Sequence, residues 1–197
     1  MLDSEQMKAM ADAAHEQGLN VHLDGARLFN AAVALNIAAS DLTKHVDSAT
    51  FCLSKGLSCP VGSIIVGSKE FIEEADRWRK MLGSGMRQVG VIAAAGLVAL
   101  DSMIDRMQED HDAARYMASR MSEMEGISVD PEHIQTNIIR FGVPLHKGNE
   151  ISARLFDEGV HVNGGDSDLR VVTHYAISTK DYDFALKAFA RVMKTVV

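Results

Sequence analysis

Cysteine is scarce in this sequence, and its two examples, Cys52 and Cys59, lie on either side of Lys55. The spaced cysteine pairs of a zinc site and the framework of a disulfide-rich secreted domain are therefore missing, and we expect no metal. The chain also lacks the run of about 18 apolar residues that a membrane helix needs. Residues 1–5 have neither the basic nor the apolar region of a secretion signal. We expect a protein of the reducing cytoplasm, with no membrane partner.

An excess of basic residues is absent too. Twenty Lys and Arg stand against 27 Asp and Glu, a net charge of -7, and the basic residues form no run. Nucleic acid is therefore not an expected partner. With 47% hydrophobic and 24% charged residues, the composition is that of a folded protein, and 197 residues leave one or two domains open.

The hydrophobic pattern predicts an α/β layer followed by a small α+β domain. Strands are expected at 21–24, 48–53 and 63–66, with helices at 4–17 and 69–81. One long helix from 89 to 125 would bridge the two parts, and the remainder alternates short strands, at 136–141, 160–163 and 169–174, with helices at 149–158 and 182–196. The predicted domains are residues 1–88, 89–125 and 126–197.

Asp24 is the first candidate for chemistry, because it ends an apolar strand and Arg27 follows three residues later. Open α/β sheets bind ligands at the carboxyl ends of their strands. The alternative is structural: Asp24 could cap the helix that follows Gly25, with Arg27 at the surface. Spacing does not choose between these two interpretations.

Lys55 is the second candidate, since it follows a strand of apolar and small residues and is bounded by Gly56. A lysine there can lose solvation, which lowers its pKa as a Schiff-base nucleophile requires. Taken alone, an ordinary solvated loop lysine remains the more common interpretation. A third segment, Gly83 to Gln88, places flexible backbone and Arg87 before the long helix, as an anion site or a simple glycine hinge would.

Taken together, three segments resemble the low-specificity L-threonine aldolases, which are fold-type-I enzymes dependent on pyridoxal phosphate. In order along the chain they read HLDGARLFNA, FCLSKGL.CPVGS and RKMLGSGMRQ.G..AAAGL. The resemblance covers nearly the whole chain. It implies the C-terminal portion of the aspartate aminotransferase-like large domain, joined to a small α+β C-terminal domain.

The resemblance also implies roles for individual residues. Lys55 would carry the cofactor, Asp24 would face its pyridine nitrogen, and Arg27 would lie near the ring hydroxyl and the substrate carboxylate. Arg170 resembles the small-domain arginine that binds that carboxylate, and Arg87 would lie near a phosphate or a subunit contact. The implied reaction is retro-aldol cleavage of a β-hydroxy amino acid, L-threonine or L-allo-threonine, to glycine and acetaldehyde by a homo-oligomer, a dimer or tetramer.

Two departures from the family pattern bear on this expectation. Ser84 stands where the family usually has the middle of three glycines, which matters only if that position needs positive φ. The family also carries an N-terminal region before the His22 motif, with strands, a stacking histidine and a phosphate-binding loop, so activity is expected only if that region is supplied. The alternatives are a truncated inactive homologue and a related β-eliminating lyase.

Overall fold

The computed structural model describes residues 1–196, which fold into two compact units. The first unit holds residues 1–106, and the second begins at Met107. Among residues 1–196, no helix combines the length and the apolar character that crossing a membrane requires.

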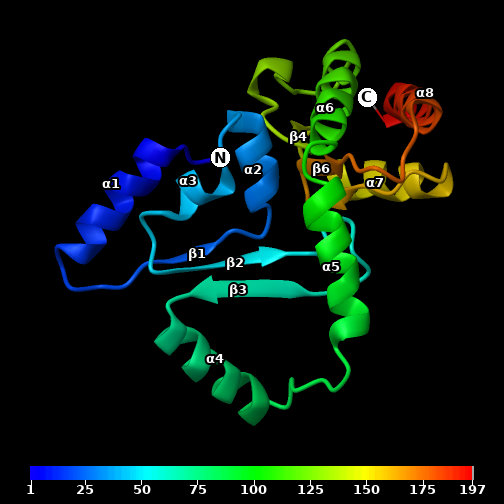
Figure 1. Cartoon of the computed structure of the whole chain (residues 1–197). Helices are drawn as coiled ribbons and strands as arrows, with labels where there is room; N and C mark the ends of the chain where they lie inside the picture. Colours follow the sequence, from blue (N-terminus) through cyan, green and yellow to red (C-terminus); the bar gives the residue numbers. More distant parts are fainter. Residues whose placement is uncertain (197) are drawn as a thin grey trace. The chain divides into compact units, whose positions relative to one another are not determined.

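The first unit is built on a three-stranded sheet in the order β1-β2-β3 (Figure 1). Strands β1 and β2 run parallel, whereas β3 runs antiparallel to β2. Only ten residues connect β2 to β3, and a parallel return needs a crossover of about a dozen or more. The sheet is therefore parallel only between β1 and β2. Its elements are α1 (Ser4–His15), β1 (His22–Asp24), α2 (Leu28–Leu35), α3 (Ala39–Thr43), β2 (Ser48–Cys52), β3 (Ser63–Gly67), α4 (Lys69–Met81) and α5 (Gly90–Ser102).

The two faces of this sheet differ in character. Phe51 of β2 is buried, and its ring meets Phe29 of α2 edge to face with 5.2 Å between centroids. Thr50, the preceding residue, is only partly buried and points to the other face, since successive strand side chains alternate. Asp24 lies opposite Thr50 and shares its face. The sheet thus has an apolar face under α2 and a polar face that carries Asp24.

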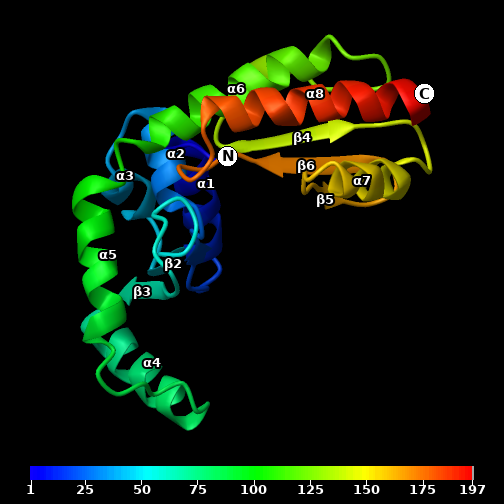
Figure 2. The same cartoon turned by 90° about the vertical axis from the view of Figure 1, so that its right-hand side faces the viewer.

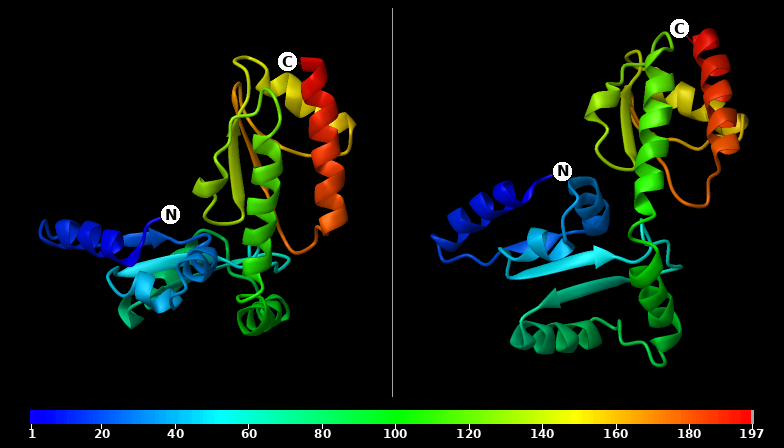
Figure 3. Two further views of the ribbon diagram at one scale, coloured as in Figure 1. Left: turned by 90° about the horizontal axis from the view of Figure 1, so that it is seen from above. Right: turned by 45° about the horizontal axis from the view of Figure 1, so that its top comes forward.

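The second unit packs three helices on an antiparallel sheet in the order β4-β6-β5 (Figure 2). Helices α6 and α8 lie side by side in Figures 2 and 3. Phe141 of β4 meets Phe189 of α8 at the centre of the core, with 5.7 Å between ring centroids. The elements are α6 (Met107–Ser122), a 3-10 turn (Pro131–His133), β4 (Ile138–Gly142), α7 (Gly148–Asp157), β5 (Asn163–Gly164), β6 (Asp168–Val172) and α8 (Thr179–Val196).

The prediction of one long helix from 89 to 125 is wrong, because two helices, α5 and α6, occupy this stretch. The break at residues 103–106 contains neither proline nor glycine, so the sequence offered no conventional signal for it. Ser102 donates a hydrogen bond to the Val98 oxygen at 2.7 Å, a back-bond that favours bending, and Glu109 and Asp110 suit the start of a new helix. The domain boundaries predicted at residues 88 and 125 stay predictions.

Candidate active site

Asp24 and the Lys55 loop lie at the carboxyl ends of two neighbouring parallel strands, β1 and β2. Asp24 is the last residue of β1 and lies opposite Thr50, and β2 ends two residues later at Cys52. The segments beyond both strands stay together, because the Cys52 N–H donates to the Ala26 oxygen at 3.4 Å. Asp24 thus ends one strand, and Lys55 follows the strand beside it.

The Asp24 carboxylate is exposed and held from one side only. Within residues 1–196, its one hydrogen bond comes from the Ala26 N–H to Oδ1 at 3.2 Å. Ala26 precedes α2, whose N-cap is Arg27 and has no side-chain capping bond. The alternative in which Asp24 caps this helix is therefore wrong. Lone pairs of the carboxylate remain available to a further donor.

The Lys55 loop is anchored by buried apolar side chains and presents the lysine outward. Leu53 and Leu57 are 4% and 2% exposed, whereas Lys55 is exposed. Backbone bonds close the loop, with the Ser58 N–H donating to the Lys55 oxygen at 2.8 Å. Burial raises the pKa of the neighbouring Cys59 thiol, which keeps it protonated and unreactive. Among residues 1–196, the Lys55 amine has no ion-pair or hydrogen-bond partner.

Arg27 is partly buried and lines a cavity of about 250 Å³ together with Asp24 and Gly25. Met7 of α1 and Leu42 of α3 complete its apolar wall. No local sequence signal predicted that these two helices would reach the Asp24 motif, because their contact depends on packing between distant segments. Asp24 and Arg27 therefore line the same cavity in the first unit.

Arg87 lies in the segment between α4 and α5, and its side chain is exposed with no ion pair inside residues 1–196. In this segment Gly83 has a φ of +80°, whereas Ser84 is not among the residues of positive φ. Serine therefore fits the middle position without backbone strain. The structure records no contact between Arg87 and Asp24, Arg27 or Lys55, so its role stays a prediction.

Arg170 belongs to the second unit and lies in the middle of β6. Its side chain is exposed, and it forms no ion pair or hydrogen bond with any side chain in residues 1–196. It lies directly opposite Arg140 of β4. A free guanidinium on a strand can receive an anion, but its role toward a substrate stays a prediction.

His22, two residues before Asp24, has hydrogen-bond partners at both ring nitrogens. Its Nδ1 lies 2.8 Å from Ser48 Oγ, and its Nε2 lies 3.0 Å from Thr50 Oγ1. Both ring nitrogens are therefore engaged by hydroxyl groups of the neighbouring strand. These two contacts are typical of a hydrogen-bonded structural histidine rather than of a free catalytic base.

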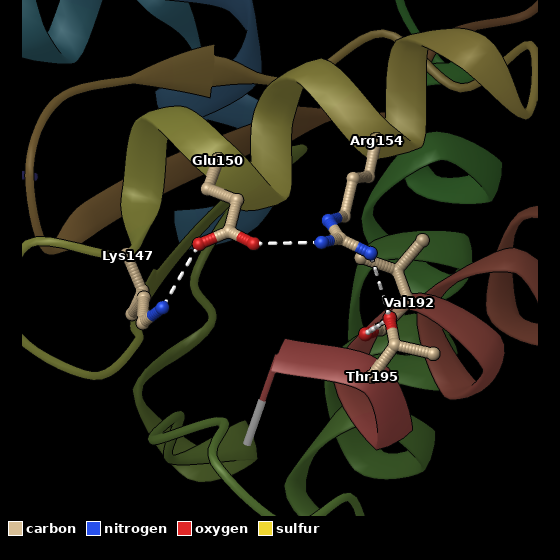
Figure 4. A network of polar contacts seen from close by, with 5 residues as sticks. All are labelled: Lys147, Glu150, Arg154, Val192 and Thr195. Atoms are coloured by element: carbon tan, nitrogen blue, oxygen red, sulfur yellow. Dashed lines mark hydrogen bonds and ion pairs between the residues drawn. The ribbon is translucent and has the colours of Figure 1, made fainter.

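A larger cleft of about 600 Å³ lies between α7 and α8, and both arginines that line it, Arg154 and Arg191, bond to carboxylates of α7 or its C-terminal end. Glu150 accepts from Lys147 and from Arg154, both at 2.9 Å, and Arg154 also reaches Thr195 at 3.3 Å (Figure 4). Arg191 pairs with Glu158 at 2.6 Å on the same cleft. This network joins two helices and occupies the arginines of the cleft with protein carboxylates.

The residues of the first unit fit the cofactor that the resemblance implies. Pyridoxal phosphate needs an accessible amine, which Lys55 offers, and an acceptor for its protonated ring nitrogen, which the free lone pairs of Asp24 offer. Arg27 adds a cation on the cavity wall beside Asp24. The donor set is therefore chemically suitable for the group.

Comparison with known proteins points in the same direction. The sequence matches the family model described as beta-eliminating lyase over residues 1–143. It is 40% identical over 201 residues to low-specificity L-threonine aldolase 1 of Arabidopsis thaliana, a match that covers 99% of this chain and 56% of that protein. Low specificity L-threonine aldolase of Escherichia coli K12 is 40% identical over 178 residues, with 90% and 52% covered. The chain thus spans about half the length of these relatives.

Solved structures share the fold. The threonine aldolase of Leishmania major superposes with a TM-score of 0.74 at 17% identity, covering 96% of this chain and 56% of that one. A PLP-dependent aminotransferase from Streptococcus suis gives a TM-score of 0.78 at 14% identity, covering 100% and 54%. The predicted fold class, part of a fold-type-I enzyme, is confirmed.

Proposed function

Because the chain belongs to the beta-eliminating lyase family, we propose that it is the part of a pyridoxal-phosphate-dependent aldehyde-lyase that carries the cofactor lysine. With the remaining region of such an enzyme supplied, it would cleave L-threonine or L-allo-threonine to glycine and acetaldehyde. The observation that carries this proposal is the parallel pairing of β1 and β2, which sends Asp24 and the Lys55 loop to one edge of the sheet.

Each residue has a distinct task in this proposal. Lys55 would hold the cofactor through its amine, the nucleophile that such a covalent bond requires. Asp24 would accept a hydrogen bond from the pyridine nitrogen and favour its protonated form. The resemblance implies the substrate carboxylate as the ligand of Arg170 and a place near that carboxylate and the ring hydroxyl for Arg27, tasks that suit planar forks of donors.

The chemistry balances without a further reactant. Pyridoxal phosphate, when bound, supplies the sink for the electron pair released as the Cα–Cβ bond of the substrate breaks. The β-hydroxyl loses its proton to a base or water, acetaldehyde leaves, and Cα takes up a proton to give glycine. His22, with both nitrogens engaged by hydroxyls, is not our candidate for that base.

The 40% identity to two proteins named low-specificity L-threonine aldolases favours aldol cleavage over β-elimination as the reaction of this chain. A homo-oligomer in the cytoplasm is the assembly and location we expect. Arg87 is proposed to lie near the cofactor phosphate or a subunit contact.

The test begins with the absorbance of the purified chain mixed with pyridoxal phosphate, followed by borohydride reduction and peptide mapping. We expect an absorbance band of a Schiff base, with the label fixed on Lys55. Lys55→Arg should abolish specific labelling, whereas Lys69→Arg, a matched change on exposed α4, should leave it intact. Label spread evenly over surface lysines would mean that this chain alone does not form the site.

A second experiment separates an inactive chain from an incomplete one. The region of the Arabidopsis relative that lies outside the match would be produced together with this chain, and acetaldehyde release from L-threonine measured. Activity that requires Lys55 would support the aldolase proposal. Labelling at Lys55 without acetaldehyde release would instead favour a homologue that binds the cofactor and is inactive in aldol cleavage.

A further inference from the structure

One face of the second unit's sheet carries a row of side chains suited to bind an anion. Arg170 of β6 lies directly opposite Arg140 of β4 on one side and opposite Asn163 of β5 on the other. Directly opposite residues project from the same face of a sheet. All three are exposed, whereas the adjacent residues Phe141 and Leu169 are buried in the core on the opposite face. We refer to Arg140, Arg170 and Asn163 as the arginine row.

The charges of this row are not balanced. Like charges directly opposite each other on a sheet are destabilising. Asp168, two residues before Arg170 on the same face, forms an ion pair with Arg140. No carboxylate in residues 1–196 pairs with Arg170. Within residues 1–196, only Arg140 of these two arginines has a carboxylate partner, which leaves a local positive charge on a chain whose net charge is -7.

We infer that Arg140 is a second carboxylate-binding residue beside Arg170, and that Asp168 competes with the ligand for it. A carboxylate between the two arginines would relieve their repulsion and accept charge-assisted hydrogen bonds from both forks. The amide of Asn163 adds a neutral donor on the far side of Arg170. That this carboxylate belongs to an amino-acid substrate rests on the proposed function, whereas the binding itself does not.

Asp168 is a carboxylate of the protein itself that competes with a ligand for Arg140. Its pairing with Arg140 is exposed to solvent, with side chains 71% and 54% exposed for Arg140 and Asp168, so it is weak and exchangeable. A ligand carboxylate would bind Arg170 first and recruit Arg140 by displacing Asp168. Removing Asp168 should therefore strengthen ligand binding, and removing Arg140 should weaken it.

The experiment is an acetate titration of the full chain, followed by nuclear magnetic resonance of the arginine Nε–Hε groups. Sodium chloride of equal ionic strength is the reference for general salt effects. The signals of Arg140 and Arg170 should shift together and report one affinity. Arg140→Gln should weaken acetate binding at Arg170 roughly threefold and Asp168→Asn should strengthen it roughly threefold, the scale of an exposed ion pair.

Arg191→Gln is the matched control, because Arg191 is likewise exposed in the second unit and paired with a carboxylate. It should leave acetate binding at Arg170 unchanged, and Arg140→Lys should retain part of the affinity by keeping the charge without the fork. The inference is overturned if Arg140→Gln leaves the affinity at Arg170 unchanged, or if Arg191 responds to acetate as strongly as Arg170. Neither result depends on pyridoxal phosphate. Loss of the inference about the arginine row can therefore be told apart from loss of the proposed function, which is tested by labelling at Lys55.

Discussion

Gly25 approaches Thr50 so closely that a Cβ added to Gly25 would lie 2.9 Å from the Thr50 backbone oxygen. Gly25 follows Asp24 at the end of β1, and Thr50 is the residue that Asp24 faces on β2. The close approach therefore holds the Asp24 segment against the strand that leads to Lys55. A side chain at residue 25 would force the two strand ends apart.

Gly25→Ala should destabilise the first unit by about 1–3 kcal/mol, the usual cost of overpacking where the contacted atom belongs to the backbone. Urea unfolding followed by the fluorescence of the single Trp78 would measure the loss. Gly90→Ala is the matched control, because nothing lies within 4 Å of its added Cβ. It should be neutral or stabilise α5 by up to about 1 kcal/mol. An equal change in the free energy of unfolding for Gly25→Ala and Gly90→Ala would show that the close contact between Gly25 and Thr50 does not limit the side chain at residue 25.

Leu57→Ala should loosen the Lys55 loop. Leu57 is 2% exposed, and truncating a buried leucine costs about 2–5 kcal/mol. Hydrogen exchange at the amides of residues 53–62 should accelerate, because their backbone bonds close around this anchor. Val61→Ala in the same loop removes a half-exposed side chain and should change exchange little. Unaltered exchange in Leu57→Ala would show that the loop is held by its hydrogen bonds alone.

Phe189→Ala should unfold much of the second unit. Phe189 is 0% exposed and packs on Phe141, so its loss should cost about 3–5 kcal/mol. Phe184→Ala on the same helix removes a ring that is 51% exposed and should cost well under about 1 kcal/mol. Backbone resonances of the second unit would follow each variant through a urea titration. Comparable midpoints for the two variants would argue against a core centred on Phe141.

Acidification should destabilise the second unit through His111. Burial is the main cause that lowers the pKa of His111, assisted by the nearby charge of Arg115 and opposed by Asp110 and Asp112. The folded state therefore binds a proton less readily than the unfolded state. Stability from this residue is present above the unfolded pKa of about 6.5 and falls as the pH drops below it.

The slope from His111 alone should approach about 1.4 kcal/mol per pH unit at most. Urea midpoints of the second unit between pH 7.5 and pH 5, an interval set by that unfolded pKa of about 6.5, would measure it. His111→Asn should flatten this dependence even if it lowers stability at every pH, and His161→Gln, an exposed control, should not. A slope that persists in His111→Asn would assign it to other groups.

Local sequence signals predicted many of the elements well. Helix α4 has the predicted bounds, Lys69–Met81, because Ser68 caps its start and Gly83 adopts the positive φ that ends it. The strands fell within a few residues of their predicted positions, because their apolar pattern and flanking turns are local features. The break between α5 and α6 escaped prediction, because residues 103–106 contain no helix breaker.

The sequence by itself determined the fold family and the candidates Asp24, Arg27, Lys55, Arg87 and Arg170, since motifs and strand ends are read along the chain. Only the tertiary structure decided which distant segments lie next to these residues. It set Gly25 against Thr50, brought α1 and α3 to the wall of the Asp24 cavity, and placed Arg140 opposite Arg170. These relationships depend on strand register and helix packing between segments far apart in sequence, and a shift of one residue in register would turn every side chain of a strand to the other face.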